Sequence, residues 1–225
     1  MSPVPSRPRL SREAIARRVA AELRHGDYVN LGVGIPILVA GFVEPPKTVI
    51  FHAENGVLGF GGAAPPDAAD PDLFNAGFQP VTLLPGAAVF DGAASFGIIR
   101  GRHLDAAVLG GLQVSERGDL ANWMRPERGV GSVGGAADIA QGARRVFVAM
   151  EHTTRDGELR IVRECSYPLT AVRAVHAIFT DVAVIRVTDD GLVLEEVAPG
   201  WSAEDVQAIT EPHLTMSPSL REMQA

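Results

Sequence analysis

Short apolar runs that do not alternate with polar residues recur along this chain. Clear examples lie at residues 48–51, 105–111 and 144–150. Such runs are typical of strands that are buried on both faces. Stretches with helical character fall between them, as at residues 138–143. This alternation predicts an α/β fold, an open and largely parallel sheet flanked by helices.

The first helix has a clear start in the sequence. Ser11 is a good N-cap, and Ile15, Val19 and Leu23 then recur every four residues on one helical face. Gly26 supplies a stop signal after that face. We therefore expect an amphipathic helix that packs its apolar stripe on the sheet.

The remaining elements follow from local signals. A strand near residue 28 enters a glycine-rich turn, and Pro36 suits the first turn of a helix that reaches about residue 43. We further expect two strands in 81–90 separated by a Pro-Gly turn, two strands in 182–197 around an Asp-Gly turn, and a helix over 203–209. The whole chain, 1–225, is predicted to form one domain, with residues 1–10 and about 212–225 flexible.

Composition excludes several classes of function. The net charge of −7 argues against a general nucleic-acid surface. The longest uncharged stretches are broken by Gly and Pro, which argues against a membrane span. The N-terminus has no apolar signal core, and Cys165 is the only cysteine, so we expect a cytoplasmic protein with this thiol buried and inert. Lys47 is the only lysine and follows two prolines, so a Schiff-base or phosphate-loop lysine is not expected.

Three loops stand out as candidate binding segments. "GVGIP" (32–36) follows the first predicted strand, and "HAENG" (52–56) follows the second. Open α/β sheets bind ligands at the carboxyl ends of their strands, where these two loops could lie side by side. A third glycine-rich loop, 129–138, precedes a helix, and backbone amides at such a start attract negative charge.

A dinucleotide site is one interpretation of these loops. Gly32 and Gly34 form a G-x-G, and Glu54 lies where a ribose-binding acid is expected. The third glycine of the fingerprint is missing, because residue 37 is Ile. The partial match makes this a weak alternative.

Metal and serine chemistry find less support. His52 and Glu54 would share one side of a strand, but two ligands are too few, and no metal site is expected. His52 is better explained as a hydrogen-bonded residue at a strand end. No G-x-S-x-G is present, and neither Ser95 nor Ser132 has the spacing of a nucleophile.

Glu54 remains the strongest candidate for a catalytic residue. A carboxylate at the end of a buried strand is partly desolvated, which raises its nucleophilicity. The Asn55-Gly56 turn would hold its side chain in a fixed direction. The alternative is that Glu54 only caps this turn, and the residues alone leave both interpretations open.

Several motifs, in order, resemble the B subunit of 3-oxoacid CoA-transferases. The resemblance runs from about residue 10 to about residue 210. It is carried by "NLGVGIPILVA", "HAENGVLGFGG", residues 75–126, "VGGAAD", "EHTTRDGELRIVRECSYPLT" and "DGLVLEEVAPG". The resemblance implies a CoA-transferase-like (NagB/RpiA-like) α/β fold and transfer of CoA from an acyl-CoA, often succinyl-CoA, to a 3-oxo acid such as acetoacetate or 3-oxoadipate.

The resemblance also implies roles for single residues. Glu54 is the nucleophile that forms a glutamyl-CoA thioester in a ping-pong reaction, and Asn55 and Gly56 complete its motif. Gly134 and Gly135 line the thioester site, and the loop with Gly32 and Gly34 binds substrate. Coenzyme A esters are the substrates, and no permanently bound cofactor is expected.

A partner subunit is implied as well. The family pairs such a chain with an A subunit in an A2B2 heterotetramer, and we find no counterpart of the A subunit's CoA loop here. The sequence departs from the family pattern at two places, with Ala53 where the family has serine and a different segment at 61–66, and both departures bear on acceptor specificity. Two alternatives remain: a CoA-ester hydrolase or hydratase that uses Glu54 as a general base, and a non-catalytic acyl-CoA-binding module.

Overall fold

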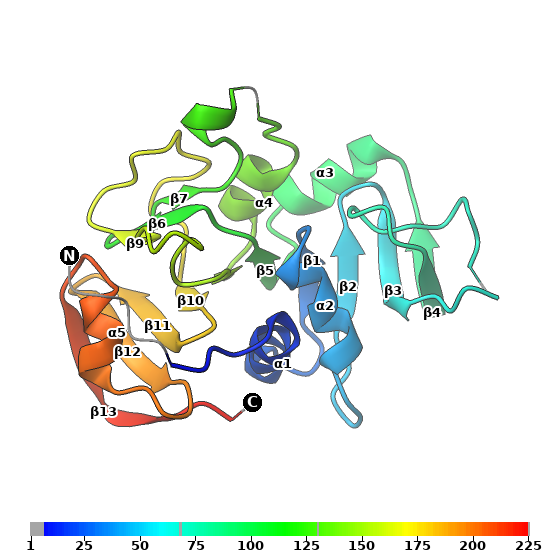
Figure 1. Ribbon diagram of the computed structural model, residues 1–225. Coiled ribbons are helices and arrows are strands. Elements are labelled where there is room, and N and C mark those ends of the chain that lie inside the picture. The colour runs from blue at the N-terminus through cyan, green and yellow to red at the C-terminus, as the bar shows by residue number, and fades with distance from the viewer. Residues whose placement is uncertain (1–6, 68, 130, 225) are drawn as a thin grey trace.

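The computed structural model describes residues 7–67, 69–129 and 131–224 (Figure 1). Within these ranges the strands are, in chain order, β1 (Tyr28–Leu31), β2 (Ile50–Ala53), β3 (Val57–Ala63), β4 (Val81–Val89), β5 (Ala106–Leu109), β6 (Gln113–Ser115), β7 (Leu120–Ala121), β8 (Val146–Ala149), β9 (Ile161–Val162), β10 (Ala177–Phe179), β11 (Ala183–Thr188), β12 (Gly191–Val197) and β13 (Leu214–Glu222). The α-helices are α1 (Arg12–Glu22), α2 (Ile35–Leu38), α3 (Gly92–Arg100), α4 (Ala136–Gly142) and α5 (Ala203–Ala208), with 3-10 helices η1 (Val39–Phe42) and η2 (Pro126–Arg128).

One large sheet organises the fold. Its strand order in the described residues is β13-β12-β11-β10-β8-β5-β1-β2-β3-β4, and a small sheet, β7-β6-β9, lies apart from it. The central strands β10, β8, β5, β1 and β2 are parallel, whereas β3, β4 and β11 pair antiparallel at the flanks. The predicted fold class, an open and largely parallel sheet flanked by helices, is confirmed.

The two faces of the sheet bury two separate cores. Along β5, Ala107 and Leu109 belong to the core that includes residues of α3 and α4, whereas Ala106 and Val108 belong to the core that includes residues of α1. Figure 1 shows the same layers, with α1 on one side of the central strands and α3 and α4 on the other. Burial on both faces explains why the strand sequences do not alternate.

The start of α1 is as predicted. The Ser11 hydroxyl accepts a hydrogen bond from Ala14 N at 3.2 Å. Ile15, Val19 and Leu23 are buried, with at most 3% of their surface exposed. The helix ends at Glu22, earlier than the glycine signal suggested.

Lys47 explains how that helix ends. Its Nζ donates hydrogen bonds to the carbonyls of Ala20 (2.7 Å) and Leu23 (3.1 Å). The last carbonyls of a helix lack partners within the helix, and a cation there also favours the helix dipole. The single lysine of the chain therefore satisfies a helix terminus.

The predicted Pro-Gly turn within residues 81–90 is wrong. Residues 81–89 form one strand, β4, whose pairing with β3 shifts register between Leu58 and Phe60. Pro85 and Gly86 lie in the extra length of β4 at this shift, where Gly86 adopts a φ of 88°. An irregularity of this kind absorbs residues that cannot join a regular ladder.

The predicted flexible C-terminal tail is also wrong. Residues 214–222 form β13, which pairs in parallel with β12 at the edge of the main sheet. Met223 has only 2% of its surface exposed, and Arg221 forms an ion pair with Glu196. Pro218 lies where the pairing skips residues, which is how an edge strand accommodates proline.

The flexible N-terminal segment is corrected for residues 7–10. Leu10 N donates to Asp181 O at 2.9 Å, and the Trp201 indole donates to Pro8 O at 2.8 Å. Residues 1–6 lie outside the described residues. No helix among the described residues combines the length and apolar character needed to cross a bilayer.

Candidate active site

Glu54 lies in a tight hairpin at the carboxyl end of β2. Residues 54–56 form the turn between β2 and β3, closed by a hydrogen bond from Gly56 N to Ala53 O at 3.0 Å. Gly56 has a φ of 109°, and a Cβ there would lie 2.1 Å from the Phe90 carbonyl oxygen. Only glycine fits this position, so the turn that carries Glu54 has a fixed shape.

The carboxylate of Glu54 is not used to hold that turn. Its Oε2 atom is buried, and no donor among the described residues reaches it. In a turn cap the carboxylate accepts a hydrogen bond from a local N–H, so this observation argues against the capping interpretation. A buried carboxylate oxygen without a partner is costly, and such groups call for a functional explanation.

A cavity of about 450 Å³ adjoins Glu54 at the carboxyl edge of the sheet. Three glycine-containing segments line it: residues 32–33 after β1, residues 109–112 at the end of β5 and just beyond it, and residues 132–136 at the start of α4. Because β1, β2 and β5 are parallel neighbours, their carboxyl ends meet at this edge. The predicted meeting of the "GVGIP" and "HAENG" loops is confirmed.

Gly135 lies directly against the acid. A Cβ on Gly135 would lie 3.4 Å from Glu54 Cγ and 3.2 Å from Phe96 Cζ. Gly134 has a φ of 52°, and a Cβ there would meet nothing within 4 Å. The absence of a side chain at Gly135 therefore keeps space open beside Glu54, whereas Gly134 mainly shapes the backbone.

The structure divides the predicted site residues into two groups. Glu54, Gly32, Gly134 and Gly135 line the same cavity. Asn55, Gly56 and Gly34 do not line it. The Asn55 amide donates to Phe74 O at 2.8 Å, Gly56 packs under Phe90, and Gly34 is the N-cap residue of α2. Their positions support the two loops rather than the cavity wall.

A buried polar trio supports the strand beneath Glu54. Asn30, His52 and Ser95 are each 0% exposed. Asn30 Nδ2 lies 3.0 Å from His52 Nδ1, and His52 Nε2 lies 3.1 Å from Ser95 Oγ. With the Asn30 amide as donor, Nδ1 accepts and the Nε2 proton points to Ser95. His52 is thus the hydrogen-bonded strand-end residue that its position indicated.

Burial lowers the pKa of His52 to about 4, so the imidazole is neutral at physiological pH. The trio can therefore orient β2 without adding a charge next to Glu54. Both ring nitrogens have partners, which leaves neither one for a metal ion. Among the described residues no group of three or more His, Cys, Asp and Glu side chains is arranged to hold a metal ion.

Sequence reasoning missed part of the cavity wall. Gly110 and Gly111 follow β5 and line the cavity, as does Asn122, whose amide donates to Gly110 O at 3.0 Å. The signal was a Gly-Gly pair directly after a buried apolar run. Asn30 and Ser95 had no local signal, because each contacts His52 from a distant part of the chain.

The cysteine differs slightly from its prediction. Cys165 is half-buried rather than fully buried. Burial and the nearby Asp119 raise the pKa of its thiol to about 12. The thiol is therefore protonated at physiological pH, and nothing points to a nucleophilic role.

Comparison with known proteins agrees with this geometry. The family described as coenzyme A transferase matches residues 12–208, which covers most of the chain and includes the whole cavity. The chain belongs to the coenzyme A transferase family. The resemblance inferred from the ordered motifs is confirmed, and the chain is a CoA-transferase polypeptide.

Two relatives of this CoA-transferase chain are similar along nearly their whole length. The beta subunit of acetate CoA-transferase from Escherichia coli (strain K12) is 49% identical, with 93% of this chain and 96% of the relative covered. The B subunit of 3-oxoadipate CoA-transferase from Pseudomonas putida (strain KT2440) is 50% identical, with coverage of 90% and 95%.

A solved structure confirms the CoA-transferase fold. The acyl-CoA transferase YdiF from Escherichia coli O157:H7 superposes with a TM-score of 0.74 at 23% identity. The match covers 98% of this chain and 44% of that protein, so the chain spans less than half of the YdiF polypeptide. At this identity the comparison supports the fold alone.

Proposed function

We propose that this chain is the B subunit of a 3-oxoacid-type CoA-transferase in which Glu54 forms a covalent thioester with coenzyme A. The donor would be an acyl-CoA such as succinyl-CoA, and the acceptor a 3-oxo acid such as acetoacetate or 3-oxoadipate. The buried, unpartnered Oε2 of Glu54 beside a glycine-lined cavity carries the proposal. Family membership supplies the class of reaction.

The first half-reaction moves CoA onto the enzyme. A Glu54 carboxylate oxygen attacks the thioester carbonyl of the acyl-CoA, and the C–S bond breaks to release the CoA thiolate. The product is an anhydride between the acyl group and Glu54. The thiolate then attacks the Glu54 carbonyl carbon of this anhydride, which releases the donor acid as a carboxylate and leaves a glutamyl-CoA thioester.

The second half-reaction reverses these steps with another acid. The acceptor carboxylate attacks the Glu54 carbonyl and expels the CoA thiolate, forming a new anhydride. The thiolate attacks the acceptor's carbonyl carbon, giving the new acyl-CoA and free Glu54. No step changes an oxidation state, so the proposal requires no redox cofactor.

The cavity wall supports this chemistry. Each tetrahedral intermediate places negative charge on a former carbonyl oxygen, and backbone N–H groups can stabilise it without reorganising. Gly134 and Gly135, at the start of α4, are the proposed donors. Because Gly135 has no side chain, an acyl carbon can approach Glu54 from that side.

A companion A subunit completes the proposed enzyme. The names of the two relatives describe a beta subunit and a B subunit. Val33 and Val133 line the Glu54 cavity yet expose 62% and 45% of their surfaces, so apolar side chains at the cavity are open to solvent. A partner over this opening would bury them and exclude water, which would otherwise hydrolyse the anhydride. We propose the A2B2 arrangement, acting in the cytoplasm.

The acceptor acid is not decided by similarity. The acetate and 3-oxoadipate enzymes are 49% and 50% identical to this chain, so overall identity favours neither. The proposal therefore names a class of acceptors, and net CoA transfer from succinyl-CoA to each acid in turn would distinguish them.

Isotope exchange tests the proposal. The chain, assembled with its A subunit, should move labelled succinate into succinyl-CoA without any acceptor and without net hydrolysis, because the first half-reaction is reversible. Glu54→Gln should remove this exchange by several orders of magnitude. Glu44→Gln, at an exposed loop glutamate, is the matched control and should retain it.

Two other outcomes would replace the proposal. Net hydrolysis or hydration of the CoA ester with no exchange would make Glu54 a general base. Tight acyl-CoA binding with neither reaction would make the chain a binding module.

A further inference from the structure

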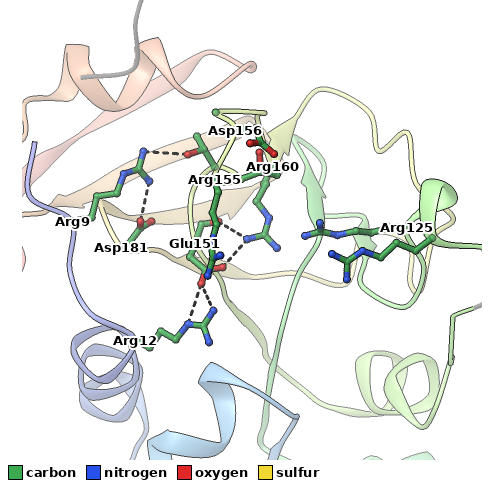
Figure 2. Close-up of a pocket in the computed structure, with 12 residues that line it drawn as sticks. Arg9, Arg12, Arg125, Glu151, Arg155, Asp156, Arg160 and Asp181 are labelled. Atoms are coloured by element: carbon green, nitrogen blue, oxygen red, sulfur yellow. Dashed lines mark hydrogen bonds and ion pairs between the residues drawn. The ribbon is translucent and has the colours of Figure 1, made fainter. Parts of the chain in front are cut away.

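A second, larger cavity lies at the same edge of the sheet as Glu54. Its volume is about 1010 Å³, and it is lined from three directions: residues 9–12 before and at the start of α1, residues 125–128 at η2, and residues 151–160 after β8 (Figure 2). Asp181, which follows β10, completes one side. The cavity is therefore built by segments that are distant in the sequence.

The lining of this cavity is strongly basic. Six arginines line it, against three carboxylates, in a chain whose net charge is −7. The arginines are Arg9, Arg12, Arg125, Arg128, Arg155 and Arg160, and the carboxylates are Glu151, Asp156 and Asp181. So local an excess of positive charge in an acidic protein requires an explanation.

Half of these arginines have structural partners. Arg9 pairs with Asp181 at 2.9 Å, and Arg12 pairs with Glu151 at 2.6 Å. Arg160 pairs with Glu151 at 3.0 Å and is itself nearly buried. Figure 2 shows these ion pairs gathered on one side of the cavity.

The other three arginines have no ion-pair partner among the described residues. Among the described residues, Arg125, Arg128 and Arg155 form no ion pair, and Asp156 is the one lining carboxylate without a basic partner. Figure 2 shows Arg125 extending toward Arg160 from the opposite wall. The pKa of Arg160 is lowered, chiefly by burial and also by the positive charge of Arg125. Positively charged guanidinium groups that surround one cavity favour the binding of an anion between them.

This cavity is in structural contact with the Glu54 cavity. Arg160 Nη2 donates to Gly111 O at 2.7 Å, and Gly111 lines the Glu54 cavity. A smaller cavity between the two shares Leu112 with the Glu54 cavity and Arg125 and Arg160 with the arginine cavity. An anion bound to the arginines would therefore lie next to the wall of the reaction site.

We propose that the arginine cavity, defined by the six arginines above, binds a phosphate-bearing anion. Guanidinium groups bind phosphate oxygens through paired, charge-assisted hydrogen bonds, and several arginines facing one hollow suit an anion with more than one charged group. The volume exceeds what a single phosphate fills and lies near the upper end of small-ligand sites. The phosphates could belong to the nucleotide end of the acyl-CoA or to a free polyanion.

Calorimetric titration with sodium pyrophosphate, at constant ionic strength, tests the site directly. The test variant is Arg125→Gln/Arg155→Gln, which alters opposite walls and removes no ion pair seen among the described residues. The matched control is Arg24→Gln/Arg102→Gln, which removes the same charge from exposed arginines that precede β1 and β5, at the other edge of the sheet. Circular dichroism and the unfolding midpoint verify that all variants fold.

The proposal predicts that the wild-type chain and the control bind pyrophosphate alike. The test variant should bind about tenfold more weakly or worse, because hydrogen bonds to charged groups are the strong ones. Arg125→Lys/Arg155→Lys should recover part of the affinity and also report on folding. Wild-type protein that fails to bind pyrophosphate in the millimolar range, or a test variant that binds as tightly as the control, overturns the proposal.

A second arm, which rests on the proposed function, identifies the source of the phosphate. It compares acyl-CoA with acyl-pantetheine, which lacks the nucleotide, in the assembled enzyme. A test variant with a raised KM for acyl-CoA only would assign the site to the substrate's nucleotide. If the test variant has the wild-type KM for each of the two esters but no longer binds pyrophosphate, the site would be assigned to a free polyanion. The calorimetric arm needs no activity, so the two proposals can fail separately.

Discussion

Glu54 combines two features that oppose stability. It lies at the end of a buried strand, and its Oε2 has no donor among the described residues. Its turn is nevertheless rigid, because Gly56 is pressed against Phe90 and Asn55 is tied to Phe74 O. A carboxylate held in fixed geometry and partly shielded from solvent is what the proposed nucleophilic attack requires.

Gly135→Ala tests whether the space beside Glu54 matters. The added Cβ would lie 3.4 Å from Glu54 Cγ, and the φ of −86° suits alanine. We expect the unfolding free energy to change by less than about 1 kcal/mol, whereas transfer should fall about tenfold or more, because it depends on approach geometry. Denaturant unfolding and steady-state kinetics of the assembled enzyme measure the two effects.

Gly134→Ala separates the effect of backbone strain from the effect of filling the space beside Glu54, because it keeps the backbone N–H and adds its Cβ elsewhere. Its φ of 52° strains an alanine by about 1 kcal/mol, but the new Cβ would contact nothing within 4 Å. If both variants lost stability equally and kept full activity, Gly135 would have no role beyond the backbone.

The buried trio shows which residue-level features sequence can and cannot predict. The strand-end environment of His52 was predictable from its place after an apolar run. Its partners, Asn30 and Ser95, were not, because they lie 22 and 43 positions away and meet it only when β1, β2 and α3 assemble. The glycines of three loops were named as candidates, whereas Gly110 was not, although the Gly-Gly pair after a buried apolar run was visible in the sequence.

At the scale of elements, local signals predicted what local forces determine. The N-cap of α1, the hairpin of β11 and β12 and the parallel strands β1, β2, β5 and β8 were recognisable, whereas the short parallel strand β10 was not predicted. The two errors, β4 and β13, share a cause, because both are edge strands that contain proline. The rule that proline and glycine break strands fails where a register shift accommodates them, and such shifts depend on the neighbouring strand.

Met223→Ala tests whether the C-terminal segment is part of the fold. Met223 belongs to the core beneath α1 and is 2% exposed, so the substitution should lower the unfolding free energy by about 2–5 kcal/mol. Met216→Ala changes the same residue type in β13 at a site 55% exposed, and should cost less than about 0.5 kcal/mol. A flexible tail would leave both variants as stable as the wild type, as judged by urea unfolding.

Lys47→Met tests the proposed role of the single lysine at the end of α1. Two hydrogen bonds to helix carbonyls would be lost, with an expected cost of about 1–2 kcal/mol. Arg24→Met, which removes an exposed charge nearby, should change stability by less than about 0.5 kcal/mol. Equal effects in thermal unfolding would reduce the lysine's role to a general charge effect.

For the whole molecule, stability should depend on pH through two buried histidines. Burial lowers the pKa of His52 to about 4, and burial, with a smaller effect of Arg9, lowers that of His152 to about 3. In the unfolded chain both titrate near 6.5, so between these values the unfolded state binds more protons than the folded state. Their stabilising contribution is complete above about pH 6.5 and is lost as the pH falls toward the folded pKa values.

Unfolding free energies measured from pH 7 to pH 4 check this dependence. Each histidine contributes a slope of about 1.4 kcal/mol per pH unit in its window. His152→Gln should reduce the slope by about that amount, whereas His103→Gln, at an exposed position, should leave it nearly unchanged. An unaltered slope in His152→Gln would show that the imidazole does not remain neutral in the folded protein.

The overall architecture was predictable because it rests on repeated patterns. Burial on both faces, strand–helix alternation and the ordered motifs all indicated the same α/β fold. The arginine cavity was not predictable, since its six arginines lie on three segments with no local pattern, and only the sheet's topology brings them together.

The central claim is that Glu54 carries coenzyme A during turnover. The most direct measurement incubates the chain and its A subunit with an acyl-CoA, reduces the complex with borohydride and maps the modified peptides by mass spectrometry. The account predicts reduction of the Glu54 side chain to an alcohol, dependent on acyl-CoA and absent from Glu54→Gln. Active enzyme in which Glu54 remains unmodified, or in which another residue carries the thioester, would contradict it.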